Sequence, residues 1–446
     1  MRLFSVKFNN NEPLYIQLYN YIKKEILNGN LKSNDSIPSK RKLAEHLNIS
    51  LNTIMEAYNM LISEGLIISI PKKGYFVSNY NIKINNINYN ELTHKKNDYK
   101  YDLTTKNIDN TLFPYFTWNK ISKNIIYNEN IFERTSSYGY YKLRNTIKEY
   151  LYETKGINVN PNNIIIGSGI EYLFTIIIDI IDKNNYAIEN PGYDKIAKIL
   201  KNHNKNIEYM EIDDEGAIIN NIKSDVIYIT PSSQFPLGIK MSMDRKFEIS
   251  SWANDKYIIE DSFDSEFKYL SNQSISLFEL NNNTILLSSY SRSISPALRI
   301  AYMILPDKLL KKYDEKYSFY STTVSTLDQM ILNEFITSGA YSRHINKVKN
   351  SYIEKKELIK SLLEKENIKI TDDGYLSMII DIDNLDKDIF KAKCLEYKID
   401  ISLLDDYYLN KKTNKIIIGY SGIKYNLINE AINLLIRAIK ESKTAI

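Results

Sequence analysis

Two segments of the chain carry groups suited to holding a phosphate-like anion. In NIIIGSGIEYL, Gly167, Ser168 and Gly169 stand between a strand-like and a helix-like run. Glycines there let backbone N–H groups approach an anion at a helix N-terminus, although a plain tight turn has the same sequence. The segment TILLSSYSRSISPALRIAY (284–302) is the more specific of the two, because its hydroxyls and guanidinium suit phosphate oxygens. Its candidate residues are Ser289, Ser291, Ser293 and Arg299.

Two other segments could hold a flat ring with a protonated nitrogen. In YAIENPGYDKI, a turn at Pro191-Gly192 would present Tyr193 at a sheet edge, where its ring could stack on a ligand. A tyrosine packed in the core is the alternative. In YIIEDSFDSEF, a strand-like run ends in Asp261. Its carboxylate could pair with a ring nitrogen or merely cap the following turn.

The elements that must position these segments alternate between strand-like and helix-like runs from residue 101 onward. This alternation predicts an α/β fold with a largely parallel or mixed sheet and helices on both faces. Such folds bind ligands at the carboxyl ends of strands, where the four segments lie. The strand-like runs are NIIIGS (163–168), YAIE (186–189), VIYIT (226–230), YIIED (257–261), TILLSSY (284–290), RIAYMIL (299–305), YLSMIID (375–381) and KIIIGYS (415–421).

The first 78 residues follow a different pattern. Apolar residues in PLYIQLYNYIKKEILN (13–28) have the three- and four-residue spacing of an amphipathic helix. Ser39 and Ser50 are candidate N-caps of two further helices. Two β-prone runs then flank PKKG (71–74), which predicts a hairpin with a basic tip. Three helices and a basic hairpin are typical of a winged helix-turn-helix, which presents a helix to base edges and a wing to phosphates. A three-helix bundle for protein contacts is the alternative.

Charge and composition agree with this division. The 446 residues include 58 Lys+Arg and 54 Asp+Glu, a net charge of +4. Residues 1–80 hold ten basic and six acidic residues, so this part carries the whole excess and suits a polyanion. Hydrophobic residues make up 43%, as in a soluble globular protein, and no apolar run is long enough to span a membrane. The N-terminus lacks a secretory pattern, so a cytoplasmic location is the simplest interpretation.

The remaining composition excludes some classes of site and marks a boundary. One cysteine, Cys394, excludes a disulfide framework, and four scattered histidines give no metal-binding spacing. Residues 79–100 are rich in Asn and Lys without periodicity. They predict a linker between a domain at 1–78 and a second domain at 101–446.

The order and spacing of these segments resemble the MocR-type regulators of the GntR family over nearly the whole chain. The matching segments include IPSKRKLAEHLNIS, KKGYFV, IIIGSGIE, IENPGY, ITPSSQFPLG and SSYSRSISPALRIAYMILP. The resemblance implies an N-terminal winged helix-turn-helix fused to a fold-type-I aminotransferase domain, an α/β fold that binds pyridoxal 5′-phosphate (PLP). It also implies double-stranded DNA and a small-molecule effector as ligands, and a homodimer.

The resemblance implies roles for residues of the second domain. Tyr193 would stack on the PLP ring, and Asp261 would pair with its pyridine nitrogen. Lys415 is the cation nearest the place of the substrate-carboxylate arginine of aminotransferases. The residues that would surround the phosphate are Ser168, Gly169, Ser289, Ser291 and Arg299.

The resemblance also implies DNA-binding residues in the first domain. These are Arg41, Ser50, Asn52 and Thr53 in the helix-turn-helix and Lys72, Lys73 and Gly74 in the wing. Leu51 and Met55 lie on the same helix. Each could touch a thymine methyl group or pack within the domain, and packing is the interpretation we favour at this point.

One departure from the family pattern bears on catalysis. The family has S-[FY]-S-K-[ST], in which the lysine forms a Schiff base with PLP, whereas this chain has Arg292 at that position. A guanidinium stays charged and is a very poor imine former. Phe263 stands where the family has a tyrosine that contacts the ring hydroxyl. Losing a catalytic acid–base typically costs about 10²–10⁴-fold in rate. We therefore expect no transaminase turnover, and PLP or a related ligand bound non-covalently if at all.

Two alternatives remain open. The chain could be an active PLP-dependent aminotransferase-type enzyme with a DNA-binding domain, if Lys195, Lys240 or Lys268 replaced the missing amine. It could also be a regulator whose second domain only dimerises and binds no small molecule. The retained Asp261, Tyr193 and Arg299 argue mildly against this last alternative.

Overall fold

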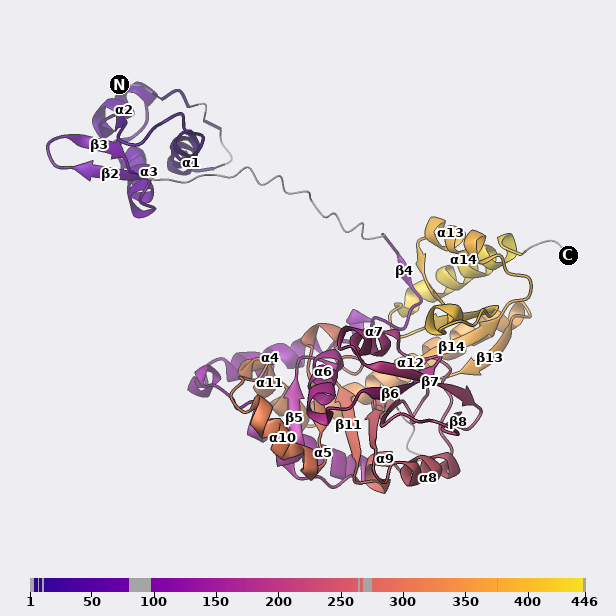
Figure 1. Ribbon diagram of the computed structural model, residues 1–446. Helices are drawn as coiled ribbons and strands as arrows, with labels where there is room; N and C mark the ends of the chain where they lie inside the picture. Colours follow the sequence, from indigo (N-terminus) through magenta and orange to yellow (C-terminus); the bar gives the residue numbers. More distant parts are fainter. Residues whose placement is uncertain are drawn as a thin grey trace. The chain divides into compact units, whose positions relative to one another are not determined.

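The chain forms two compact units, Met1–Lys96 and Asn97–Ile446 (Figure 1). The computed structural model describes residues 4–6, 8–9, 12–79, 98–263, 265–267, 275–374 and 376–443. Most of the predicted linker at 79–100 therefore lies outside the described residues.

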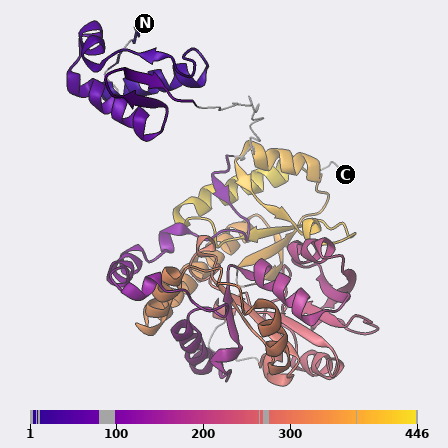
Figure 2. The same cartoon turned by 60° about the vertical axis from the view of Figure 1, so that its left-hand side comes forward.

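The first unit is a winged helix-turn-helix, as predicted. Its helices are α1 (Leu14–Leu27), α2 (Lys40–Leu47) and α3 (Leu51–Ser63), and its described strands are β1 (Ser36–Ile37), β2 (Ile67–Ile70) and β3 (Gly74–Val77). The strands pair antiparallel in the order β1-β3-β2. Figure 2 shows this unit from a second side.

The two predicted caps start helices α2 and α3 of this unit. Ser39 accepts a hydrogen bond from the backbone N–H of Lys42, and Ser50 accepts one from that of Thr53 (3.1 Å). Such caps satisfy N–H groups that have no partner within the helix. The buried Tyr58 of α3 donates to the carbonyl of Pro38 (2.8 Å) and so ties α3 to the start of α2.

The second unit is built on a mixed sheet. Its order in the described part of the chain is β5-β12-β11-β10-β9-β6-β7-β8. The strands are β5 (Ile164–Gly167), β6 (Asn185–Asn190), β7 (Asn206–Asp213), β8 (Gly216–Ala217), β9 (Val226–Ile229), β10 (Tyr257–Asp261), β11 (Thr284–Ser289) and β12 (Ala301–Ile304). Strand β12 runs antiparallel to both of its neighbours, and β8 is an antiparallel edge.

Helices cover both faces of this sheet, as the alternating pattern predicted. Ile164, Ile166 and Leu286 point to a core shared with α5 (Tyr141–Lys155) and α11 (Thr326–Thr337). Ile165 and Leu287 point to the opposite face, covered by α6 (Ile170–Ile181), α7 (Asp194–Asn202) and α10 (Asp307–Tyr317). Successive side chains on a strand face opposite ways, which explains the division. The remaining helices on this sheet are α4 (Tyr115–Ile125), α8 (Met243–Trp252) and α9 (Leu277–Leu280).

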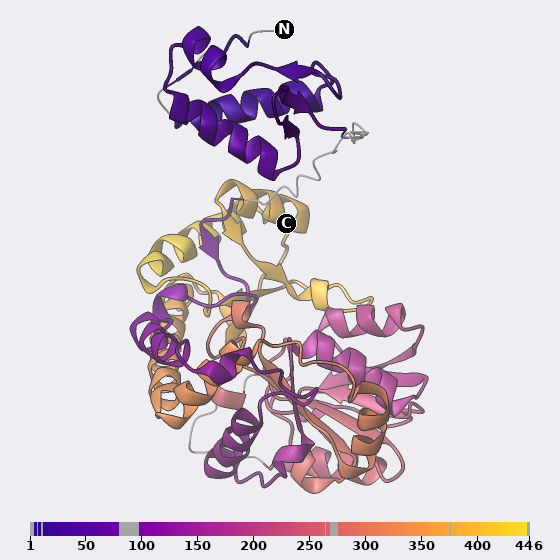
Figure 3. The ribbon, with the colours of Figure 1, turned by 90° about the vertical axis from the view of Figure 1, so that its left-hand side faces the viewer.

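A C-terminal layer has its own core at one end of the second unit (Figure 3). Its sheet is antiparallel, in the order β13-β14-β17-β16 within the described residues. Two predicted runs, at 375–381 and 415–421, thus belong to this sheet and not to the central one. The elements are β13 (Lys369–Asp373), β14 (Ser377–Asp381), β16 (Ser402–Leu403), β17 (Lys415–Gly419), α12 (Ala340–Lys365), α13 (Lys387–Glu396) and α14 (Ile428–Glu441).

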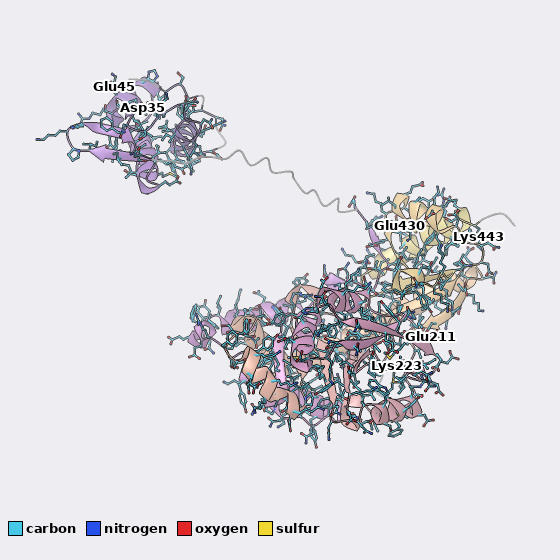
Figure 4. All side chains as sticks on the ribbon, in the orientation of Figure 1. Asp35, Glu45, Glu211, Lys223, Glu430 and Lys443 are labelled. Atoms are coloured by element: carbon cyan, nitrogen blue, oxygen red, sulfur yellow. The ribbon has the colours of Figure 1, made fainter. Side chains whose placement is uncertain are left out.

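The first described residues of the second unit are anchored on this layer. Strand β4 (Tyr101–Asp102) pairs in parallel with β15 (Ile399–Asp400). Lys100 forms an ion pair with Glu430 of α14 (2.9 Å), a residue labelled in Figure 4. In the described part of the chain, no helix is long and apolar enough to cross a membrane.

Candidate functional site

The sheet brings the predicted strand-end segments to one edge. Strands β5, β6, β10 and β11 run parallel, so their carboxyl ends meet there. Because β12 is reversed, its amino end lies at the same edge. Ala301 pairs with Gly167 on one side and with Ser289 on the other. Arg299, just before β12, is thereby brought beside Ser168, although 131 residues separate them.

An acidic side chain holds the cations at this edge. Arg299 Nη2 lies 3.0 Å from Glu171 Oε2 and donates to the carbonyl of Ser168 at 3.2 Å. Lys195 Nζ lies 2.9 Å from the other oxygen of Glu171. Burial acts to raise the pKa of Glu171, but the hydrogen bond from Lys195 and the charge of Arg299 outweigh it and lower that pKa to about 2. Glu171 was not among the predicted site residues, and Lys195 was named only as an alternative source of the missing amine.

The backbone beside Arg299 leaves no room for a larger residue at position 169. Gly169 has a φ of +97°, and a Cβ built on it would lie 2.5 Å from Arg299 Nη2. This glycine is the N-cap of α6, whose first N–H groups have no partner within the helix. In the described residues, the hydroxyls of Ser289 and Ser291 make no hydrogen bond. A guanidinium, a helix N-terminus and two available hydroxyls form a donor set that suits a phosphate.

A buried carboxylate lies at the same edge. Asp261 ends β10, is 4% exposed, and accepts a short hydrogen bond from the hydroxyl of Tyr228. Burial, together with this carboxylate, raises the pKa of Tyr228 well above its ordinary value, so its proton stays on the phenol. A carboxylate fixed in this way could accept a hydrogen bond from a protonated ring nitrogen.

Aromatic rings line the space next to Asp261. Tyr193, at the start of α7, contacts Phe235 edge to face, with ring centroids 6.1 Å apart. Phe263 contacts the same ring at 6.0 Å. Lys195 Nζ lies 5.6 Å from the centroid of the Tyr193 ring. Tyr193 is partly exposed, so it is available for stacking.

Arg292 lines a small cavity between the strand ends and the C-terminal layer. Phe235, Phe263, Gln234 and Ser377 are among its other lining residues. Its volume of about 20 Å³ is room for one or two waters. A substrate-sized molecule therefore needs this space to widen.

Lys415 is not brought together with these residues. Ser377, which lines the Arg292 cavity, pairs with Gly419 at the carboxyl end of β17. Lys415 begins that strand, four residues away, which is about 13 Å along an extended chain. The nearest candidate for an effector carboxylate at this cavity is Arg292 itself.

Sequence reasoning also missed a buried acid, Glu189, near the end of β6. Its carboxylate accepts hydrogen bonds from the N–H (3.1 Å) and the hydroxyl (2.6 Å) of Thr230. Burial raises the pKa of Glu189 to about 7, and the nearby charge of Asp261 adds to the shift. The position of Glu189 before Asn190-Pro191, in the same strand-end motif as Tyr193, was the available signal.

A second candidate site lies in the first unit, at the start of α3 and at the hairpin. The Ser50 hydroxyl bonds to the Thr53 hydroxyl (2.8 Å), so both residues serve the cap. Arg41, Asn52, Lys72 and Lys73 are exposed. No ion pair involves these basic side chains within the described residues. Lys72 has a φ of +62° and Gly74 one of +108°, as the tight hairpin requires.

The interpretation that Leu51 and Met55 pack within the domain is wrong. They are 40% and 38% exposed, whereas Ile54 and Ala57 of the same helix are fully buried. The helix turns its apolar stripe of Ile54, Ala57, Tyr58 and Leu61 to the core. Leu51 and Met55 fall outside this stripe. Elsewhere, the described residues contain no His, Cys, Asp and Glu group fit for a metal ion.

A wider cavity lies at the other end of the central sheet. It measures about 690 Å³ and is lined by Asn158, Asn163, Asn283 and Lys308, among others. No predicted site residue lines it.

Comparisons with known proteins agree with both units. Residues 14–77 match the family of bacterial regulatory proteins named gntR. The chain is 33% identical to the uncharacterized HTH-type transcriptional regulator YdeL of Bacillus subtilis, over 96% of this chain and 97% of that protein. It is 22% identical to the probable rhizopine catabolism regulatory protein MocR of Rhizobium meliloti, over 95% and 93%. An archaeal alanine:glyoxylate aminotransferase superposes with a TM-score of 0.70 at 20% identity, over 76% of this chain and 91% of that chain.

Proposed function

Because this chain belongs to the MocR-type branch of the gntR family of HTH-type transcriptional regulators, we propose that it binds specific DNA sequences and that its aminotransferase-like unit senses a small molecule. The observation that carries this proposal is the winged helix-turn-helix with exposed basic residues, in one chain with an aminotransferase fold. Since its DNA ligand lies in the cytoplasm, we place the protein there.

DNA footprinting tests the first half of the proposal. The full chain is incubated with duplexes from upstream of its own gene and of the neighbouring gene. We expect protection of a defined site that survives competition by random-sequence DNA. Binding that is weak, salt-sensitive and equally strong on every sequence would contradict the proposal, since phosphate contacts alone behave in this way.

For the second half, we propose that PLP or a related phosphorylated ring compound binds without a covalent bond. The donor set around Arg299, Ser168 and Gly169 fits a phosphate, and Asp261 fits a protonated ring nitrogen. When bound to a lysine amine, PLP supplies an electron sink for amino-group chemistry. In this chain we propose that Arg292 takes the position of that lysine, so the amine is missing.

Binding of PLP and its covalent attachment to the protein are measured separately on the purified chain. A thermal melt with PLP is expected to show a melting temperature that rises with PLP concentration. Borohydride treatment followed by mass spectrometry is expected to leave the chain unmodified. The matched variant Arg292→Lys restores an amine, and we expect it to give an absorbance band near the visible edge and a fixed adduct. An adduct on the unaltered chain would contradict the non-covalent proposal.

We further propose that the chain has no transaminase activity. An assay with PLP, an amino donor and a keto acid is expected to give no turnover above the protein-free rate. The same assay on a known aminotransferase serves as the positive control. Appreciable turnover by this chain would favour the alternative of an active enzyme with a DNA-binding domain.

We also propose that the chain is a homodimer formed through its second unit. In that unit, exposed aromatic residues gather in and beside α4, and burial of such side chains favours association. They include Tyr115, Phe116, Tyr127 and Phe132, which are 63%, 83%, 88% and 87% exposed. Light scattering of the full chain tests this, with Phe116→Ser and Phe132→Ser together expected to shift the mass toward one chain.

A further inference from the structure

The first two turns of α3 present an apolar pair to solvent. Leu51 and Met55 are one helical turn apart and are 40% and 38% exposed. Asn52 and Glu56 are exposed beside them. The capping bonds between Ser50 and Thr53 hold the start of the helix in place. The exposed surface at this N-terminus is therefore defined by two apolar side chains, one amide and one carboxylate.

Helix α3 lacks the side chains that read guanine. In the stretch Leu51–Ser63, all of it described, Glu56 is the only charged residue. Guanine is read most often by arginine or lysine, which donate two hydrogen bonds to its major-groove edge. The basic side chains of this unit that lie near α3 in sequence include Lys40, Arg41 and Lys42 and, in the hairpin, Lys72 and Lys73. They suit phosphates, which carry no sequence information directly.

The exposed groups on α3 match the features of an A·T pair. Thymine carries a C5-methyl group in the major groove, and apolar side chains contact it favourably. Adenine offers a donor and an acceptor that an asparagine amide can bind together. Exposed Leu and Met side chains lose water contact when they cover a methyl group, and each buried CH₂-sized group contributes about 0.8 kcal/mol.

We propose that Leu51 and Met55 recognise thymine methyl groups and that Asn52 recognises a neighbouring adenine, so that each half-site is centred on A·T pairs. This inference rests on the proposed DNA-binding function. It adds the class of sequence that the site selects and the two residues that select it. Glu56 adds repulsion toward phosphates, so it also keeps α3 from binding DNA by charge alone.

Selection followed by removal of single methyl groups tests the inference. The full chain first selects duplexes from a random library. Each thymine of the selected half-site is then replaced by deoxyuridine, which differs only by the missing methyl group. We expect a loss of about fourfold in affinity at the contacted thymines and none elsewhere, the equivalent of one buried methyl group.

The variants Leu51→Ala and Met55→Ala assign the contact to a side chain. Each variant is expected to bind the thymine and uracil duplexes equally well at one position, because the partner of the methyl group is gone. Ile62→Ala is the matched control. Ile62 is 38% exposed on the same helix but lies two turns further along, so its removal is expected to leave the discrimination unchanged.

The outcomes separate this inference from the function on which it rests. A library that yields no enriched sequence overturns the proposed function and the inference with it. An enriched sequence whose thymines can all be replaced by deoxyuridine without loss overturns the inference alone. The same holds if Leu51→Ala and Met55→Ala keep the full discrimination between thymine and uracil.

Discussion

Candidate ligand-binding cations of the two units differ in whether they have an acidic partner. Arg41, Lys72 and Lys73 of the first unit are exposed, and no ion pair involves them in the described residues. In the second unit, Arg299 and Lys195 share the carboxylate of Glu171, and Lys355 is buried against Asp109. Lys355 needs a partner within the fold because it is buried, whereas Arg299 and Lys195 are about half exposed and still pair with Glu171. A ligand of the second unit therefore competes with an internal acid, but DNA does not.

The largest effect expected from this comparison is on stability. Lys355 is fully buried, lies 2.8 Å from Asp109, and donates to the carbonyl of Ile423. The variant Lys355→Met leaves Asp109 as an uncompensated buried charge, so we expect unfolding of the second unit to become easier by about 3–5 kcal/mol. Urea denaturation followed by tryptophan fluorescence measures this, since both tryptophans, Trp118 and Trp252, lie in that unit.

A surface lysine provides the control for that variant. Lys72→Met removes the same charge from the hairpin of the first unit and is expected to change stability by less than about 0.5 kcal/mol. Pairing Lys355→Met with Asp109→Leu removes both charges and is expected to recover much of the loss. Equal effects of Lys355→Met and Lys72→Met would contradict the contrast between the units.

Two acids of the second unit, Glu189 and Glu171, are expected to make stability depend on pH in opposite directions. The pKa of buried Glu189 is raised to about 7, so its folded form keeps a proton that the unfolded chain releases near its ordinary value. Its contribution to stability is therefore present at low pH and is lost as pH rises from about 4.5 through 7, by about 3 kcal/mol. Glu171, with a pKa lowered to about 2, contributes above its ordinary pKa and loses that contribution as pH falls toward 2.

Denaturation curves between pH 5 and 8 measure the Glu189 effect. The variant Glu189→Gln is neutral at every pH, so we expect its stability to vary less over this range than that of the unaltered chain. Glu153→Gln, a change at an exposed position of α5, is the control and should keep the original slope. An unchanged slope in Glu189→Gln would show that another group titrates.

The exposed cations should govern DNA affinity. Removing two phosphate contacts with Lys72→Ala and Lys73→Ala is expected to weaken binding by up to about 60-fold at 0.1 M salt, from a salt slope of roughly 0.9 per contact. The slope of affinity against salt should fall by about two, with sequence preference retained. Fluorescence anisotropy at several salt concentrations measures both. A loss of affinity with the same salt slope would exclude phosphate contacts as the cause.

The smallest expected effect is a change in PLP affinity when Glu171 is replaced. Glu171→Gln leaves Arg299 and Lys195 without their shared carboxylate, so we expect PLP to bind about tenfold more tightly, equivalent to about 1.4 kcal/mol. Calorimetric titration measures this, with Glu153→Gln again as control. Weaker binding in Glu171→Gln would mean that this acid organises the site for its ligand and does not compete with it.

Local sequence rules predicted some features well because those features depend on neighbours along the chain. Ser39 and Ser50 as caps, the PKKG hairpin and the apolar strands of the central sheet all follow from residues within a few positions. Strand β7, NIEYMEID, was not among the predicted runs because its apolar residues are interrupted by acidic ones. The fold class needed only the alternation of elements, and it is confirmed by the structure and by the aminotransferase match.

The missed features depend on residues far apart in the sequence. Arg299 meets Glu171 across 128 residues, and Lys355 meets Asp109 across 246. No local pattern encodes such a pairing, because the reversed strand β12 and the long helix α12 create it. The exposure of Leu51 and Met55 was misjudged for a related reason. Apolar type alone does not say which side of a helix faces the core.

The long helix α12 connects two distant parts of the second unit. Near its start, Tyr341 and His344 bind Ser293 on the loop that carries both Arg292 and Arg299. About 33 Å further along the helix, Leu363 packs in the core that also contains Tyr101. Because α12 connects the arginine loop to the core around Tyr101, a ligand bound at this loop would shift the helix. We expect slower amide hydrogen exchange around Tyr101 when the ligand is bound.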